Sequence, residues 1–298
     1  MVADKTNRQP AAKSKTSSIA GPSPSKQWSE RVFLSYSPVW IAVLAAIVKL
    51  KLYESFTAET YLFVGVATAA PCVLIPLLCD LLWTTPDSGR PLFERHWFKV
   101  NLWIAIVGYI GNHFYTHYFY QVLGMRYTVP TDGWTINGVP VCMYLLTHPY
   151  FCSYHSVTTQ ILRAIRYKTP AIWRTGVLCA AITGIAYITA FMETYTISGF
   201  PHYTYPDWTL MLTVGSAFYA MLFLATFPLF ARLDECSLFD PIETPSRASP
   251  LSQTMLDAFA AAMIAFCLFD VWRLAVGPFV SFPAPVVNVD VPSVPFAQ

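Results

Sequence analysis

Titratable side chains inside apolar segments are the first candidates for chemistry in this 298-residue chain. Two histidines and an amide fall within Gly111–Phe119, and at helical spacing they share one face with other polar groups. The residues of that face are Tyr109, Asn112, His113, Thr116, His117 and Tyr120. Lipid cannot satisfy such a polar stripe, so we expect it to face other protein or a cavity.

Further ionisable groups lie in later apolar segments, namely His148, His155, Glu193, Asp257, Asp270 and Arg273. Glu193 has no cation nearby in the sequence, and loss of water favours the neutral form of a carboxyl group. A carboxylic acid that stays neutral in neutral solution is what general acid catalysis needs. Asp270 and Arg273 stand three residues apart on one predicted helix, and this spacing predicts an ion pair.

The elements that position these groups are predicted to be membrane helices. The chain is 55% hydrophobic and only 12% charged, whereas soluble domains carry roughly a quarter of charged residues. Seven apolar segments approach the roughly 20 residues that cross a bilayer. They cover about residues 32–50, 60–83, 97–123, 138–162, 172–198, 209–231 and 254–276. The sequence therefore predicts an all-α, polytopic membrane protein with about seven transmembrane helices.

The flanks and the basic residues set the organisation of the chain. We expect a disordered polar N-terminal tail over residues 1–27, a membrane domain over 28–278 and an irregular Pro- and Val-rich C-terminal tail over 279–298. All but four of the 19 Lys and Arg residues fall on one side of a seven-helix arrangement. Because cytoplasmic loops carry the excess of basic residues, this bias predicts a cytosolic N-terminus.

Depth along the predicted helices brings several candidates together. At about 1.5 Å per residue, His117, Glu193 and Asp270 lie roughly 8–9 Å below the non-cytosolic ends of their helices. His148 lies roughly 15 Å below that end, and His155 lies deeper. Four different helices are therefore expected to bring acid and base groups to similar depth on one side of the membrane.

The sequence does not contain the residues that several function classes require. The last apolar segment has no lysine for a retinal, six histidines are too few for a di-iron hydroxylase, and no P-loop or GxGxxG is present. The net charge of +2, without a basic patch interleaved with aromatics, argues against nucleic acid as a partner. The seven cysteines show no CxxC or zinc-site spacing, so we expect no metal site. The residues alone indicate a membrane protein for an apolar ligand, with buried acid and base groups.

A set of residue runs follows in order between Trp28 and Pro278. They are Trp97-Phe98-Lys99-Val100-Asn101-Leu102-Trp103, Gly111-Asn112, Thr116-His117-Tyr118-Phe119, Val122-Leu123-Gly124, Tyr127-Thr128, Asn137 with Val139-Pro140, Leu146-Thr147-His148, Tyr154-His155, Glu193-Thr194, Phe200-Pro201, Arg232 with Asp234-Glu235, and Asp270 with Trp272-Arg273-Leu274 and Gly277-Pro278. In this order the runs resemble the cycloeucalenol cycloisomerase family, the cyclopropyl sterol isomerases of plant sterol synthesis. His113 and His202 stand where that family has an aromatic residue.

The resemblance implies that the 9β,19-cyclopropane ring of cycloeucalenol opens to give obtusifoliol. An acid must protonate C19, a cationic centre develops at C9, and a base removes the C8 proton. No electrons are exchanged, so we expect no cofactor. A dry site and aromatic faces suit the developing cation. The resemblance also implies an endoplasmic reticulum membrane location and a sterol substrate that comes from the bilayer.

On this hypothesis, Glu193 is the proton donor, and His117 or His148 is the base or a proton relay. The residues expected to bind the substrate are Tyr109, Asn112, Thr116, Tyr120, Phe151, Tyr154, His155 and Tyr187. Asp270 with Arg273 is expected either to hold the last helix or to orient the sterol hydroxyl.

Two other classes stay open at this point. A haem- or metal-dependent membrane oxidoreductase would use His113 and His117 with His148 and His155, because histidine pairs on different helices can ligate haem. A non-enzymatic lipid transporter or lipid-binding protein would use Glu193 and the histidines as a proton path, although the two halves of the chain show no repeat of the kind that many transporters have.

Overall fold

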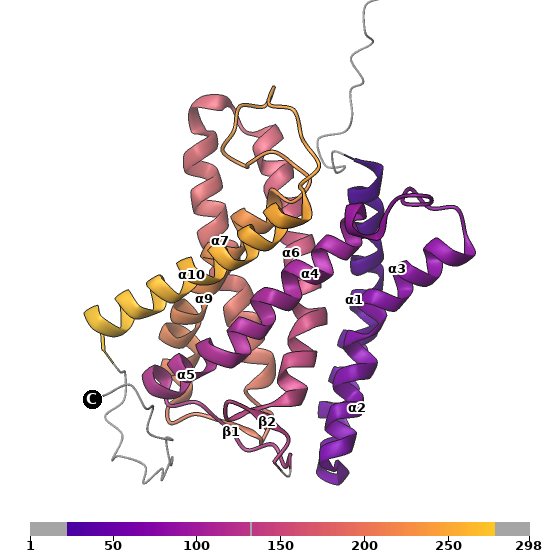
Figure 1. The fold of residues 1–298 in the computed structure, drawn as a ribbon. Coiled ribbons are helices and arrows are strands. Elements are labelled where there is room, and N and C mark those ends of the chain that lie inside the picture. The colour runs from indigo at the N-terminus through magenta and orange to yellow at the C-terminus, as the bar shows by residue number, and fades with distance from the viewer. Residues whose placement is uncertain (1–22, 132, 278–298) are drawn as a thin grey trace, which may run out of the picture.

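The computed structural model describes residues 23–131 and 133–277, and helices account for most of them (Figure 1). The α-helices are α1 Pro24–Lys49, α2 Ala58–Ala69, α3 Pro71–Leu82, α4 His96–Ile110, α5 Thr116–Tyr118, α6 Val141–Lys168, α7 Ala171–Ile197, α8 Trp208–Leu210, α9 Ser216–Ala231 and α10 Leu251–Ala275. Short 3-10 turns at Leu52–Ser55 and Leu92–Glu94 join some of them. The predicted C-terminal tail, and the N-terminal tail through residue 22, lie outside the described residues.

The first helix differs from its predicted bounds. Helix α1 begins at Pro24 rather than near residue 32, so residues 24–27, which were expected in the tail, form its first turn. Ser23 caps this turn, because its Oγ accepts a hydrogen bond from the Lys26 backbone N–H at 3.2 Å. Pro24 stands in the first turn, where a missing N–H costs no helical hydrogen bond.

Three π-helical segments interrupt the regular helices. Helix α4 continues through a π segment at Gly111–Tyr115, then α5, then a second π segment at Phe119–Leu123. A third π segment, Met211–Gly215, joins α8 to α9. The predicted segment 97–123 is therefore one helical run, but its register departs twice from 3.6 residues per turn. The predicted polar stripe does not share one environment: Asn112 is buried, while Tyr109 is 50% exposed.

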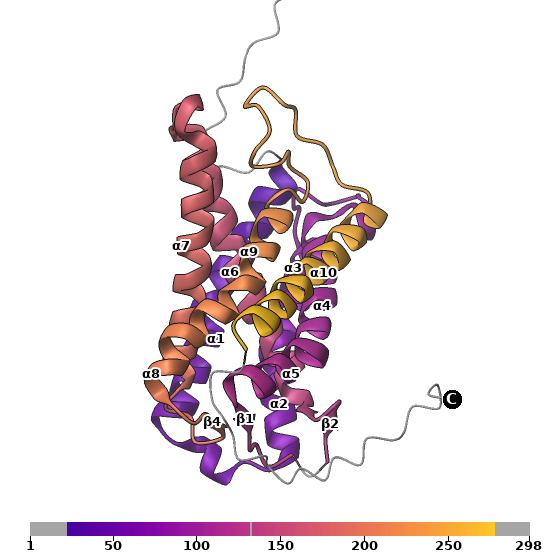
Figure 2. The ribbon, with the colours of Figure 1, turned by 90° about the vertical axis from the view of Figure 1, so that its left-hand side faces the viewer.

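Helix α6 lies in the middle of the bundle. It contacts α1, α2, α4, α7 and α9, and the bundle continues from α7 to α9, then to α10 and α4. Figure 2 shows α7 at one edge, with α10 and α4 at the other. Large aromatic side chains fill the interior, among them Trp97, Trp103, Phe218, Phe223, Phe227 and Phe269.

Two small antiparallel sheets close the end of the bundle opposite the N-terminus (Figure 1). Strand β1 (Arg126–Tyr127) pairs with β4 (Tyr203–Thr204), and β2 (Thr135–Ile136) pairs with β3 (Val139–Pro140). The all-α prediction omitted these four short strands. In the β1–β4 register Tyr127 stands opposite Tyr203, so the two loops after the third and fifth predicted segments meet.

The described helices fit a membrane protein. Four of them are long and apolar enough to span a bilayer: α1, α7, α10 and the run Trp208–Ala231. Helices α2 and α3 meet at a bend of 42° and would make a fifth span if they cross together. Helix α6 is less apolar, because its polar side chains lie inside the bundle rather than against lipid. The seven-span count and the cytosolic N-terminus stay predictions.

Candidate active site

The carboxyl group of Glu193 lies near the C-terminal end of α7 and faces hydroxyl groups. Its Oε1 accepts a hydrogen bond from the Tyr219 hydroxyl of α9 at 3.0 Å. Tyr154 of α6 also interacts with this carboxyl group. Oε2 is buried and has no hydrogen-bond partner among the described residues. This carboxyl group is therefore the candidate for acid chemistry at this end of the bundle.

Five tyrosines, here called the tyrosine shell, lie close enough to Glu193 to feel its charge. They are Tyr127, Tyr150, Tyr154, Tyr203 and Tyr219, all of which interact electrostatically with the carboxyl group. Neighbouring rings are in contact, with centroids 5.8 Å apart for Tyr127 and Tyr203 and 5.7 Å for Tyr150 and Tyr154. Burial raises the pKa of Tyr127 and of Tyr203, which stand in the strands, so both remain neutral phenols.

Local sequence explains why α7 can present Glu193 to this shell. Ala186 and Ala190 are fully buried and stand on the same face as Glu193, so α7 approaches its neighbour closely. Tyr219 follows the π segment Met211–Gly215 by about one turn. Such segments are rare and occur frequently at functional sites.

His117 does not contact the tyrosine shell directly, but one aromatic ring, that of Tyr120, lies between them. Its Nε2 is 2.9 Å from the backbone oxygen of Asn137, and a carbonyl only accepts, so Nε2 donates. The neutral ring then carries its lone pair on Nδ1, as a base requires. The ring contacts Tyr120 at a centroid distance of 5.5 Å, and Tyr120 contacts Tyr127 at 6.3 Å. His117 thus reaches the shell through Tyr120.

A cavity of about 450 Å³ opens beside His117. Its lining consists of Phe114, His117, Tyr118, Gln121, Asn137, Phe266 and Arg273. Next to it, Asp270 accepts a hydrogen bond from the Tyr118 hydroxyl at 3.2 Å and pairs with Arg273 at 3.2 Å. The predicted Asp270–Arg273 ion pair is therefore confirmed, and both side chains are nearly half exposed.

His148 faces α4 rather than Glu193. Its Nε2 is 2.7 Å from Asn101 Oδ1, while Asn101 Nδ2 donates to the carbonyls of Cys72 and Trp97. The amide oxygen must therefore accept from His148 Nε2–H, which leaves the lone pair of the neutral ring on Nδ1. His155 is different: its Nδ1 donates to the Phe151 carbonyl at 2.9 Å, and five aromatic rings surround it.

The other predicted binding residues are spread over the bundle. Asn112 donates to the Thr147 hydroxyl at 2.9 Å, Thr116 is buried, and Tyr109 stacks on His113 at 5.3 Å. The exposed Tyr187 lies 3.5 Å from the Thr213 carbonyl oxygen, and Phe151 packs on Phe223. Of the predicted set, the structure brings Tyr154 to Glu193 directly, and Tyr120 and His117 through Tyr127. In the described part of the chain, no group of three or more His, Cys, Asp and Glu residues could hold a metal ion.

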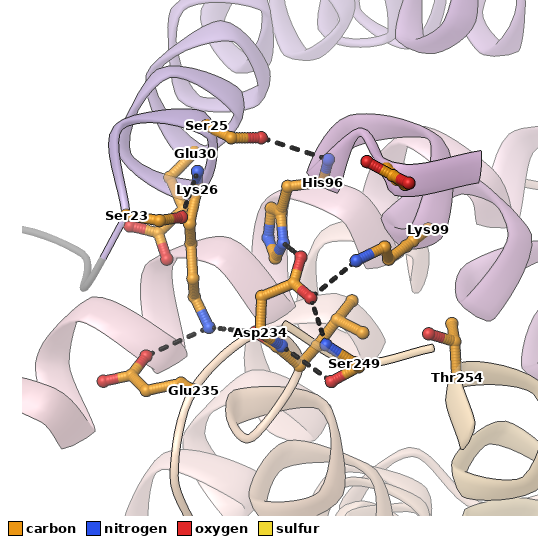
Figure 3. A network of polar contacts seen from close by, with 12 residues as sticks. Ser23, Ser25, Lys26, Glu30, His96, Lys99, Asp234, Glu235, Ser249 and Thr254 are labelled. Atoms are coloured by element: carbon orange, nitrogen blue, oxygen red, sulfur yellow. Dashed lines mark hydrogen bonds and ion pairs between the residues drawn. The ribbon is translucent and has the colours of Figure 1, made fainter. Parts of the chain in front are cut away.

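The opposite end of the bundle holds a buried ion network that the sequence analysis missed (Figure 3). Its members are Lys26, Glu30, His96, Lys99, Arg163, Asp234 and Glu235. Asp234 accepts from His96 Nδ1 at 2.8 Å and from Lys99 at 2.7 Å. Burial alone would raise the pKa of Asp234, but the hydrogen bonds and charges of His96 and Lys99 hold it well below its usual value.

The second half of this network centres on Arg163 of α6. Its guanidinium pairs with Glu30 of α1 at 2.6 Å and with Glu235 at 3.0 Å, and Lys26 also pairs with Glu235 at 3.0 Å. Burial raises the pKa of Glu235, but Lys26 and Arg163 lower it by more than burial raises it, so the pKa of Glu235 lies below its usual value. A sequence signal did exist, because the adjacent acids Asp234 and Glu235 follow an apolar segment on the side that holds most of the basic residues.

Together, the helical bundle and the buried acid define a membrane-type protein with a carboxyl group among phenols. No family model and no solved structure matches the chain. Over 266 residues, the chain is 39% identical to a protein of Arabidopsis thaliana named cycloeucalenol cycloisomerase, with 88% of this chain and 90% of that protein covered. The chain belongs to the cycloeucalenol cycloisomerase family, and it is an isomerase of sterol biosynthesis.

Proposed function

We propose that the protein opens the 9β,19-cyclopropane ring of cycloeucalenol to give obtusifoliol, with Glu193 as the proton donor. The observation that supports this most directly is the buried Glu193 carboxyl group. Tyr219 donates to its Oε1, Tyr154 also interacts with the group, and Oε2 has no hydrogen-bond partner among the described residues. The substrate class comes from the name of the relative.

The reaction balances without an oxidant or a reductant. The C9–C19 bond breaks, and its electron pair takes the proton of Glu193 at C19, which becomes a methyl group. C9 is left cationic. A base removes the C8 proton, and the C8–H electron pair forms the C8–C9 double bond. One proton is taken up and one is released, so a proton transfer back to Glu193 restores the enzyme.

The tyrosine shell supplies what this reaction needs besides the acid. Aromatic faces carry a negative quadrupole that attracts a developing cation, by about 0.5–2 kcal/mol per ring depending on desolvation. A water-poor site strengthens this attraction and protects the cation from capture by water. Tyr127 and Tyr203 add a phenol layer from the two loops that meet in the β1–β4 pair.

His117 is the base that fits this site better than His148. Both histidines carry a lone pair on Nδ1 when neutral, because each Nε2 donates to an oxygen. His117, however, borders a cavity and reaches the tyrosine shell through Tyr120. His148 lies against Asn101 of α4.

The substrate is proposed to enter from the lipid bilayer, and the enzyme is proposed to reside in the endoplasmic reticulum membrane. Cycloeucalenol is an apolar molecule with one hydroxyl group. The cavity beside His117 combines apolar rings with the polar side chains Gln121 and Arg273, which suits such a molecule.

The decisive experiment feeds cycloeucalenol to the purified protein in deuterated water. We expect obtusifoliol with deuterium in the C19 methyl group. Glu193→Gln, which nearly keeps the shape of the side chain, is expected to lower the rate of product formation by about 10²–10⁴. The same change at the exposed Glu54 is expected to leave the rate unchanged. Unchanged sterol with the wild-type protein contradicts the function, and wild-type turnover by Glu193→Gln contradicts the acid.

The variants His117→Phe and His148→Phe test which of the two histidines is the base. We expect His117→Phe to lower kcat by about 10²–10⁴, the usual contribution of general acid–base catalysis. His148→Phe is expected to act mainly on folding, since it breaks the hydrogen bond to Asn101. The reverse pattern would assign the base to His148.

A further inference from the structure

Tyr219 makes the two oxygens of the Glu193 carboxyl group inequivalent. The Tyr219 hydroxyl donates to Oε1 at 3.0 Å, and Tyr154 also interacts with this carboxyl group. The buried Oε2 has no donor within hydrogen-bond distance among the described residues. In a neutral carboxylic acid one oxygen is of the carbonyl type and accepts, and the other carries the proton. An oxygen that accepts the phenol hydrogen bond takes the carbonyl role.

We infer that Tyr219 is a positioning residue, which places the acid proton of Glu193 on Oε2 and stabilises the carboxylate after proton transfer. This inference rests on the proposed function, because it assigns a role within the same proton transfer. Tyr219 acts through Glu193 and needs no contact with the sterol.

A free acid proton suits transfer to carbon. C19 has no lone pair, so it cannot compete with an oxygen acceptor for a proton that is already in a hydrogen bond. With the proton on Oε2, no such bond must break first. When the proton leaves, Oε1 keeps its phenol donor, and that bond becomes charge-assisted and shorter. A donor that is already in place stabilises the new charge without rearrangement.

The packing around Tyr219 holds the phenol in this position. Its ring contacts Phe119 at a centroid distance of 5.3 Å and Phe223 at 5.1 Å. Phe119 begins the second π segment, and Tyr219 follows the third. Two of the three irregular segments therefore meet at the residue that fixes the acid.

The test compares Tyr219→Phe with Tyr36→Phe. Tyr36 is a buried tyrosine of α1 whose hydroxyl donates to the Thr68 carbonyl at 2.9 Å, so the control also removes one buried hydrogen bond. For Tyr219→Phe we expect kcat for cycloeucalenol to fall by about 10²–10³, as when an oxyanion donor is lost, with KM changed less than about twofold. The solvent deuterium isotope effect on kcat is expected to increase, because proton transfer becomes slower. Tyr36→Phe is expected to change neither.

A double variant shows whether the two residues act as a unit. Adding Tyr219→Phe to Glu193→Gln is expected to cause no further loss of kcat, since the phenol acts only through the acid. Multiplying losses would overturn the inference. So would a Tyr219→Phe enzyme with wild-type kcat, or one that loses only affinity.

Infrared spectroscopy tests the hydrogen bond independently of turnover. The carbonyl stretch of protonated Glu193 is identified by its loss in Glu193→Gln, and it is expected to move to higher wavenumber in Tyr219→Phe. If that variant fails to fold, 3-fluorotyrosine at position 219, a stronger donor of nearly the same shape, is expected to move the band to lower wavenumber. An unmoved band contradicts the positioning role. If the wild-type enzyme makes obtusifoliol and Tyr219→Phe does so with the same kcat, this inference alone is wrong. If the wild-type enzyme makes no obtusifoliol, the proposed function is wrong and this inference falls with it.

Discussion

The two ends of the bundle treat buried carboxyl groups in opposite ways. In the ion network, Asp234 pairs with Lys99 and Glu235 with Lys26, each within 3.0 Å (Figure 3). Glu30 pairs with Arg163 at 2.6 Å. In the tyrosine shell, Glu193 meets the hydroxyl groups of Tyr219 and Tyr154, and no described residue forms an ion pair with it. Paired charges fix helices to one another, whereas the carboxyl group without an ion pair is the one that we propose as the proton donor.

The backbone shows the same contrast. The ion network joins regular helices: the first turns of α1 and α4, the last turns of α6 and the loop after α9. The tyrosine shell is bordered by π segments in the run after α4 and before α9. Irregular helices leave room to place side chains outside the ordinary register, at some cost in backbone hydrogen bonding. We therefore assign fold stability mainly to one end and chemistry to the other.

The variant Glu193→Gln gives the strongest test of this difference between the two ends of the bundle. We expect kcat to fall by about 10²–10⁴, the usual contribution of a general acid. The unfolding temperature in detergent is expected to stay unchanged or to rise, because a neutral amide replaces a buried acid without leaving a cation unpaired. Activity and thermal unfolding measured on the same preparation check both halves. A large loss of stability would place Glu193 with the structural charges instead.

The converse change is Arg163→Met in the ion network. Removing the guanidinium leaves Glu30 and Glu235 buried without their shared cation, although Lys26 still pairs with Glu235. Breaking a buried pair in this way costs about 3–5 kcal/mol, so the unfolding transition should shift strongly. Turnover per folded molecule is expected to stay near that of the wild type. The control is Lys168→Met on the exposed side of the same helix, with an effect within about 0.5 kcal/mol.

Acid provides a third test of the same network. The pKa values of Asp234 and Glu235 are lowered in the folded protein, so both groups bind protons more weakly than in the unfolded chain. Their contribution to stability is present above the unfolded carboxyl pKa, about 4, and is lost as the pH falls through the lower folded values. The contribution of these two carboxyl groups to the unfolding temperature should therefore be level from neutral pH down to about 5 and decline below about 4. Asp234→Asn should make that fall shallower, and an unaltered slope would contradict it.

Much of the fold could be predicted from the sequence, because length and apolarity determine where a bilayer helix can lie. The predicted segments fall on the helices α1 to α10, except that α1 begins earlier and α6 runs six residues further, to Lys168. Glu193 could be proposed for the same reason, because it is an acid on a small-residue face of an apolar helix. The Asp270–Arg273 pair followed from local spacing alone.

Long-range choices were beyond the sequence. A 3.6-residue period predicts one face for Asn112, His113 and His117, but Asn112 contacts Thr147 of α6, whereas His117 contacts Asn137 in the loop. Nothing in the spacing says that His148 selects Asn101 on another helix. Glu193 and Tyr219 lie 26 positions apart, so their pairing depends on how α7 packs on α9. The basic residues counted for membrane orientation include Lys26 and Arg163, which are buried in ion pairs, and the sequence did not reveal that.

The smallest expected effect comes from Asp270→Asn, and it tests whether burial explains the contrast. Asp270 and Arg273 form an ion pair at 3.2 Å, but the side chains are 47% and 44% exposed, against 6% and 1% for Glu30 and Arg163. Water already solvates the exposed pair, so its loss should change the free energy of unfolding by less than about 1 kcal/mol. The amide of Asn can still accept the hydrogen bond from Tyr118. If thermal unfolding of Asp270→Asn shifts as far as that of Arg163→Met, then burial is not what separates structural charges from the others. A small shift together with a raised KM for cycloeucalenol would instead place Asp270 at the sterol hydroxyl, on the side of the molecule that does the chemistry.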